Sequence, residues 1–213
     1  MGARGSGRRS ARPGRSPGRR ATGPVSLKSF PRRTLRGDRT IYRIHRSDRT
    51  PWWFSSAGGG RFDPVGTGIG ACYLAEAQLG AWVEVFRKRL LLPEPEIAHR
   101  SLLGVALRRD LRLADVTSRR ALSFETTASL GANEQYADSQ AFAVQVLQAG
   151  FDGVRYFVRH DDPAQRLYGL ALFSQAGAPN PADANWPDDS DTIPDALVKD
   201  AERLFGYRVL PTP

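Results

Sequence analysis

Three consecutive glycines followed by an arginine and an aromatic residue, Gly58-Gly59-Gly60-Arg61-Phe62, form the segment of this sequence best suited to chemistry. Glycine permits positive φ angles and lets the backbone approach a ligand closely. The planar guanidinium group of Arg61 offers paired donors that suit a phosphate or a carboxylate. Arg43 is a second arginine that could point to the same place. The sequence therefore predicts an anion clamp, and a flexible turn beside two surface arginines is the alternative.

Tyr73 and Glu84 are further candidates, because an aromatic ring and a carboxylate add stacking and charge to such a clamp. Tyr73 ends a short apolar run, and its ring could stack on a base or simply lie half-buried in a strand. Glu84 lies within a helical pattern whose apolar stripe includes Trp82 and Phe86. At about 100° per residue, Glu84 points about 140° away from this stripe. Periodicity alone therefore favours a solvated glutamate unless another wall of the domain covers that side.

Several common kinds of site are excluded by the residues present. The single cysteine, Cys72, rules out an internal disulfide, and three scattered histidines show no zinc-ligand spacing. The glycine run lacks the sequence of a P-loop or of a dinucleotide-binding Rossmann unit. No serine lies in a nucleophile-elbow context. We therefore expect neither a metal site nor a hydrolase triad.

The candidate residues lie on elements that the hydrophobic pattern predicts. Strands outnumber helices and no regular strand-helix repeat occurs, so we predict an α+β fold with a mixed, mainly antiparallel sheet and packed helices. Asn133 is the expected cap of one helix, and Gly150 its end. Expected strands are 40–46, 71–74, 102–107, 111–116, 153–158 and 167–173, and expected helices are 76–90, 134–149 and 194–205.

The basic charge of the chain is concentrated at its N-terminus. Residues 1–39 contain 12 of the 31 Lys and Arg residues and only one of the 22 Asp and Glu residues. Residues 40–213 therefore hold 19 basic and 21 acidic residues, a net charge of −2. We predict a disordered basic tail over 1–39 and one domain over 40–213. Nucleic acid is an unlikely partner of this domain, and the tail could contact it only non-specifically.

The sequence shows no targeting or membrane segment. The twin arginines of the tail are not followed by an apolar run, which argues against a secretory signal. No apolar run approaches the roughly 20 residues that a membrane-spanning helix requires. We therefore predict a cytoplasmic protein that does not use a membrane.

Two blocks of residues resemble the RES domain family. The family hallmark is a Gly-Gly-Arg-aromatic turn, a strand that contains tyrosine and a helix that carries a glutamate. The resemblance extends from about Thr40 to Ser174. The first block is Tyr42-Arg43, Gly59-Gly60-Arg61-Phe62, Cys72-Tyr73-Leu74-Ala75 and Glu84, and the second is Gly150-Phe151-Asp152-Gly153-Val154-Arg155-Tyr156 and Ala171-Leu172-Phe173.

This resemblance implies a bacterial NAD⁺-degrading domain with a fold similar to that of ADP-ribosyltransferases. Such a domain is often the toxin of a toxin–antitoxin pair, so it implies a cognate antitoxin as partner. NAD⁺ is the substrate, and no further cofactor is implied. The catalytic residues correspond to Arg61, Tyr73 and Glu84, and Arg43, Gly59 and Gly60 join Arg61 and Tyr73 in binding the dinucleotide.

The acceptor of the ADP-ribosyl group stays open at this point. Phosphorolysis, hydrolysis and ADP-ribosyl transfer to a protein all fit the residues, as does a domain that binds NAD⁺ or ADP-ribose with impaired catalysis. Family members usually carry a serine in the second block where this chain has Val158. Arg159 and His160 are the neighbouring polar residues that could replace it.

Overall fold

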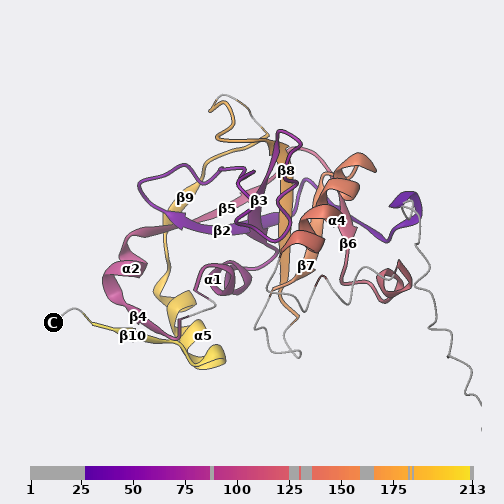
Figure 1. Cartoon of the computed structure of the whole chain (residues 1–213). Helices are drawn as coiled ribbons and strands as arrows, with labels where there is room; N and C mark the ends of the chain where they lie inside the picture. The colour runs from indigo at the N-terminus through magenta and orange to yellow at the C-terminus, as the bar shows by residue number, and fades with distance from the viewer. Residues whose placement is uncertain are drawn as a thin grey trace, which may run out of the picture.

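The structure is a computed structural model that describes residues 27–86, 89–124, 130, 136–158, 166–181, 183 and 185–211. Most strands join one large sheet, and helices pack against it (Figure 1). The strands are β1 (Arg32–Leu35), β2 (Thr40–Arg46), β3 (Ile69–Ala75), β4 (Leu91–Pro93), β5 (Arg100–Ala106), β6 (Leu111–Asp115), β7 (Gly153–Phe157), β8 (Tyr168–Gln175), β9 (Ser190–Thr192) and β10 (Arg208–Leu210). The helices are α1 (Gln78–Phe86), α2 (Glu94–Ala98), α4 (Ala137–Gln148) and α5 (Asp195–Phe205), with 3-10 turns at Leu27–Ser29 and Arg119–Phe124.

The large sheet has eight strands in the order β1-β6-β7-β8-β3-β2-β5-β9. Its neighbouring strands are antiparallel except for β6 and β7, which run parallel. A separate two-stranded parallel sheet joins β4 and β10. The predicted fold class, with a mixed, mainly antiparallel sheet and packed helices, is therefore confirmed.

Helices α1 and α4 pack on different parts of the large sheet. Helix α1 lies between the sheet and α5 (Figure 1), where Trp82 and Phe86 pack with Leu197 of α5. Helix α4 packs beside β7 and contributes Phe142 to a second cluster that contains Tyr156. None of the described helices has the length and hydrophobicity needed to span a bilayer.

The predicted boundary at residue 39 is wrong, because the sheet begins earlier. Strand β1 pairs antiparallel with β6, and Phe30 packs on the ring of Phe142 at 5.4 Å between centroids. Three of the four β1 residues are exposed, so this edge strand has the arginine-rich composition of a solvated tail. The predicted tail over residues 1–26 lies outside the described part of the chain.

The other predicted elements occur with shifted ends. Helix α1 ends at Phe86 instead of Leu90, because the chain turns at Leu90 and forms β4 against β10. The strands that we expected over 40–46, 71–74, 102–107, 111–116, 153–158 and 167–173 are all present, as are the later helices. The predicted cap Asn133 lies outside the described residues.

Candidate functional site

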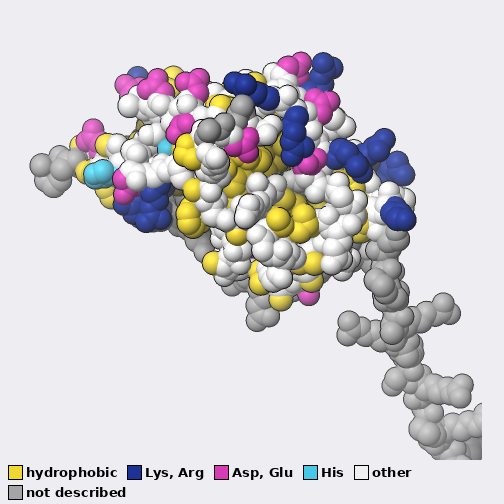
Figure 2. Space-filling model, turned by 90° about the horizontal axis from the view of Figure 1, so that it is seen from above, with side chains coloured by type: hydrophobic (Ala, Val, Ile, Leu, Met, Phe, Trp, Pro, Cys, Tyr) yellow, Lys and Arg dark blue, Asp and Glu magenta, His cyan; other side chains and the backbone are white. Residues whose placement is uncertain are grey.

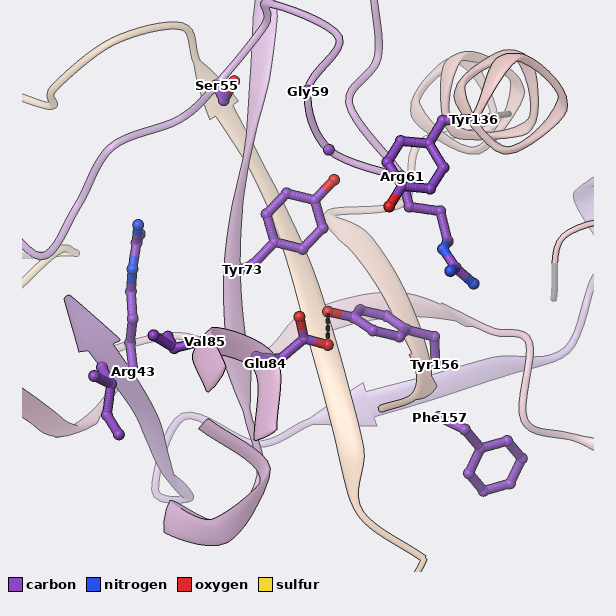
Figure 3. A pocket seen from close by; sticks show the side chains of 12 residues that line it. Arg43, Ser55, Gly59, Arg61, Tyr73, Glu84, Val85, Tyr136, Tyr156 and Phe157 are labelled. Atoms are coloured by element: carbon purple, nitrogen blue, oxygen red, sulfur yellow. Dashed lines mark hydrogen bonds between the residues drawn. The ribbon is translucent and has the colours of Figure 1, made fainter. Parts of the chain in front are cut away.

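One cavity of about 360 Å³ brings the candidate residues together. Its walls come from β2, the glycine turn, β3, α1, β7 and the start of α4. Figure 3 shows Tyr73 and the Glu84 carboxylate in the middle of the cavity. Arg43 lies on one side of them, and Arg61 and Tyr136 lie on the other. The six residues predicted from the sequence all line it: Arg43, Gly59, Gly60, Arg61, Tyr73 and Glu84.

The cavity opens where β2 and β3 separate. These strands are paired at Tyr42 and Ala75, and further along β3 the loop residue Ser55 bridges to Ala71. Arg43 crosses this separation, and its guanidinium donates a hydrogen bond to the buried Cys72 thiol. Burial raises the pKa of Cys72, so this thiol stays protonated and is a poor nucleophile.

The glycine turn is held from both sides by side-chain hydrogen bonds. Asp63 is fully buried and accepts bonds from the Gly60 N–H at 3.0 Å and from the Ser55 hydroxyl at 3.3 Å. From α4, Gln140 donates to the carbonyl groups of Gly58 and Gly60 at 2.8 and 3.0 Å. These bonds hold the turn from both sides and favour an ordered turn over the alternative of a flexible one.

The Tyr73 hydroxyl belongs to the same group of hydrogen bonds around Asp63. It accepts a hydrogen bond from the Phe62 N–H at 2.8 Å and donates one to Asp63 at 2.9 Å. Burial, followed by the Asp63 charge, raises the pKa of Tyr73 well above its ordinary value. A phenol that stays protonated and already makes two hydrogen bonds cannot act as a general base. Tyr73 therefore offers a ligand the face of its ring.

Glu84 faces the cavity because β7 covers its side of α1. The Tyr156 hydroxyl donates a hydrogen bond of 3.0 Å to the Glu84 carboxylate (Figure 3). Glu84 is half-buried and lines the cavity wall, so the solvated interpretation from helix periodicity is wrong. The covering wall comes from a strand about 70 residues further along the chain.

Arg61 leaves the turn toward α4. Its Nη1 donates to the Leu130 carbonyl at 3.1 Å, and its guanidinium carbon lies 5.6 Å from the centre of the Tyr136 ring. These contacts hold the guanidinium between Leu130 and Tyr136, and Arg61 lines the cavity. The charge of Arg61 therefore stands on the opposite side of Glu84 from that of Arg43 (Figure 3).

Four positions of this site were not predicted from the sequence: Asp63, Tyr136, Gln140 and Tyr156. Asp63 and Gln140 hold the turn, whereas Tyr136 and Tyr156 line the cavity. Two of them had a signal: Tyr156 lies in the second sequence block, and Asp63 closely follows the glycines. Val158 does not line this cavity and packs with Val83 and Leu167 in a small apolar cluster. Arg159 and His160 lie outside the described residues.

The described residues form no cluster that could hold a metal ion, and the face shown in Figure 2 carries mixed charge. No group of three or more His, Cys, Asp or Glu residues converges among the described residues. Figure 2 shows basic side chains in separate patches with acidic side chains between them on the face that it presents. This distribution matches the mixed charge counted for residues 40–213.

Comparisons with known proteins agree with this geometry. The model of the RES domain matches residues 40–191. The chain belongs to the RES domain family. Among solved structures, this RES domain is similar to a chain of the crystal structure of the M. tuberculosis MbcT–MbcA toxin–antitoxin complex. The match has a TM-score of 0.56 and 19% identity and covers 81% of this chain and 92% of the other. The comparison with curated proteins found no significant match.

Proposed function

We propose that this RES domain binds NAD⁺ in the cavity and cleaves the bond between nicotinamide and ribose. The observation that carries the proposal is the Glu84 carboxylate, held by Tyr156 in a cavity that also contains an aromatic ring and two arginines. A carboxylate in this setting stabilises a cation, and guanidinium groups hold a pyrophosphate. These are the charges that NAD⁺ develops or carries.

The binding roles follow from where each group lies. Arg43 and Arg61 pair with the pyrophosphate from opposite sides, and Gly59 and Gly60 let the backbone approach it. The Tyr73 ring packs against the nicotinamide, while its hydroxyl keeps the glycine turn in place. Glu84 lies near this ring, so its carboxylate would face the ribose of a nicotinamide bound there.

Cleavage breaks the bond between ribose C1′ and the pyridinium nitrogen. The bond electrons go to the nitrogen, so nicotinamide leaves as a neutral molecule without a proton donor. Positive charge develops at C1′ and the ring oxygen, as in glycoside cleavage. The negative charge of Glu84 stabilises this oxocarbenium-like state, and Tyr156 keeps the carboxylate oriented toward it. An oxygen atom of phosphate or water then bonds to C1′, and an attacking water loses a proton to solvent.

The biological role that we propose is that of a cytoplasmic toxin with a cognate antitoxin. The family assignment supports it, and the similar solved structure is described as a toxin–antitoxin complex. An enzyme that exhausts the cellular pool of NAD⁺ would stop growth, so we expect a partner that restrains it. The antitoxin is therefore expected to block access to the cavity.

Controlled expression in a bacterial host tests this proposal. Expression of the wild-type chain should deplete cellular NAD⁺ and arrest growth, and Glu84→Gln should prevent both. Asp189→Asn makes the same chemical change at an exposed carboxylate outside the cavity and should behave like wild type. Unchanged NAD⁺ and normal growth during wild-type expression would overturn the proposal.

A further inference from the structure

A second, larger cavity of about 660 Å³ adjoins the candidate site. The two cavities share Arg43, Ile44 and Val85 as lining residues, so they lie side by side with Arg43 at their border. Four arginines line the second cavity, and no Asp or Glu does: Arg43, Arg46, Arg49 and Arg100.

The positive charge of this second cavity is only partly neutralised. Arg46 forms a bidentate pair with Asp48 at 2.9 Å. The carboxylate near Arg100 is Glu96 at 3.6 Å, and Glu96 also binds Arg89 at 2.7 Å. Within the described ranges, neither Arg43 nor Arg49 pairs with a carboxylate. A surplus of about two positive charges suits a doubly charged phosphomonoester.

The turn that carries Arg49 is held in a fixed shape by His45. The His45 Nδ1 lies 2.9 Å from the Arg46 carbonyl and 3.1 Å from the Arg49 carbonyl, so this nitrogen carries the hydrogen. Its Nε2 is 3.0 Å from the Ser190 hydroxyl of β9. The Arg49 N–H closes the turn on the Arg46 carbonyl at 3.1 Å. An anchored backbone reduces the entropy lost when Arg49 binds a ligand.

Trp53 provides an aromatic surface at the same cavity. Its neighbours Trp52 and Phe54 are each 1% exposed in the core, whereas Trp53 is 56% exposed. An exposed indole is a stacking platform for a nucleobase. A base on Trp53 and a phosphate on Arg49 are the two parts of a phosphorylated nucleoside.

We infer that the second cavity binds the adenosine end of the dinucleotide and has a site for a phosphomonoester on its ribose. Adenine stacks on Trp53, the 2′-phosphate pairs with Arg49, and Arg43 holds the pyrophosphate between the two cavities. NADP⁺ is then a ligand and substrate of this domain, bound more tightly than NAD⁺. This inference rests on the proposed function for its substrate and on the second cavity for its selectivity.

Calorimetric titration of the full chain with nucleotide fragments tests this selectivity without any turnover. Adenosine 2′,5′-bisphosphate should bind about tenfold or more tightly than AMP, as a charge-assisted contact provides. Arg49→Ala should bring the two affinities together, and Arg33→Ala, an exposed arginine on the distant strand β1, should leave the difference intact. Trp53→Ala should weaken both fragments about tenfold.

Two results would overturn the inference. One is absent binding of the bisphosphate, or affinities for it and AMP that agree within a factor of two. The other is competition by inorganic phosphate together with no effect of Trp53→Ala, which would assign the arginines to a free anion. A parallel assay of NAD⁺ turnover keeps the proposals apart: absent turnover refutes the proposed function, whereas fragment binding alone decides the selectivity of the second cavity.

Discussion

Replacing Asp63 by asparagine removes the charge that holds the glycine turn. One carboxylate oxygen accepts the Tyr73 hydroxyl at 2.9 Å, and the other accepts the Gly60 N–H at 3.0 Å and the Ser55 hydroxyl. The asparagine amide has one accepting oxygen, so one of these sides must face an NH₂ group. A hydrogen bond to a charged group contributes about 1.5–3 kcal/mol.

We expect Asp63→Asn to lower the free energy of unfolding by about 2 kcal/mol. The variant loses a hydrogen bond to a charged group, but it no longer has the cost of burying that charge. For a domain of this size the melting temperature should fall by about 4–8 °C. Thermal unfolding followed by circular dichroism measures this change. The control, Asp189→Asn at an exposed carboxylate, should leave the melting temperature unchanged. A melting temperature for Asp63→Asn within 1 °C of wild type would refute the role of the Asp63 charge in holding the glycine turn.

Substitutions at Gly60, Tyr156 and His45 test other parts of the structure. A side chain at Gly60 would overlap neighbouring side-chain oxygens, whereas Gly59 has open space, so calorimetry should show Gly60→Ala unfolding several degrees below Gly59→Ala. Tyr156→Phe removes the 3.0 Å bond to Glu84 and should lower kcat for NAD⁺ about tenfold or more with a smaller change in KM; an unchanged kcat would contradict it. Burial lowers the pKa of His45, so the free energy of unfolding should fall between pH 7 and 5 as the unfolded state takes up a proton. This fall should be smaller in His45→Gln.

The sequence predicted the parts of the site that local composition determines. The glycine turn is visible in three adjacent residues, and β2 and β3 are short runs with strand composition. Strand β1 was not predicted, because an edge strand with solvent-facing arginines has the composition of a tail. The end of α1 was misplaced because Leu90 continues the apolar pattern, although the chain has already turned there.

The remaining site features depend on contacts between distant segments. The orientation of Glu84 is decided by Tyr156, and helix periodicity cannot show that β7 covers this side of α1. Gln140 reaches the turn from α4 without any sequence signal. Asp63 had a local signal, since it follows the glycines closely and aspartate often accepts backbone N–H groups in turns. The catalytic and binding roles of the six predicted residues stay predictions.

We propose that this RES domain cleaves NAD⁺ at the nicotinamide–ribose bond by means of Glu84. Separation of the products formed from NAD⁺ by the purified chain, with and without phosphate, tests it most directly. We predict released nicotinamide, accompanied by phosphorylated ADP-ribose when phosphate is the acceptor or by ADP-ribose when it is water, and no release by Glu84→Gln. Intact NAD⁺ after incubation, or cleavage at the pyrophosphate to AMP and nicotinamide mononucleotide, would contradict the claim.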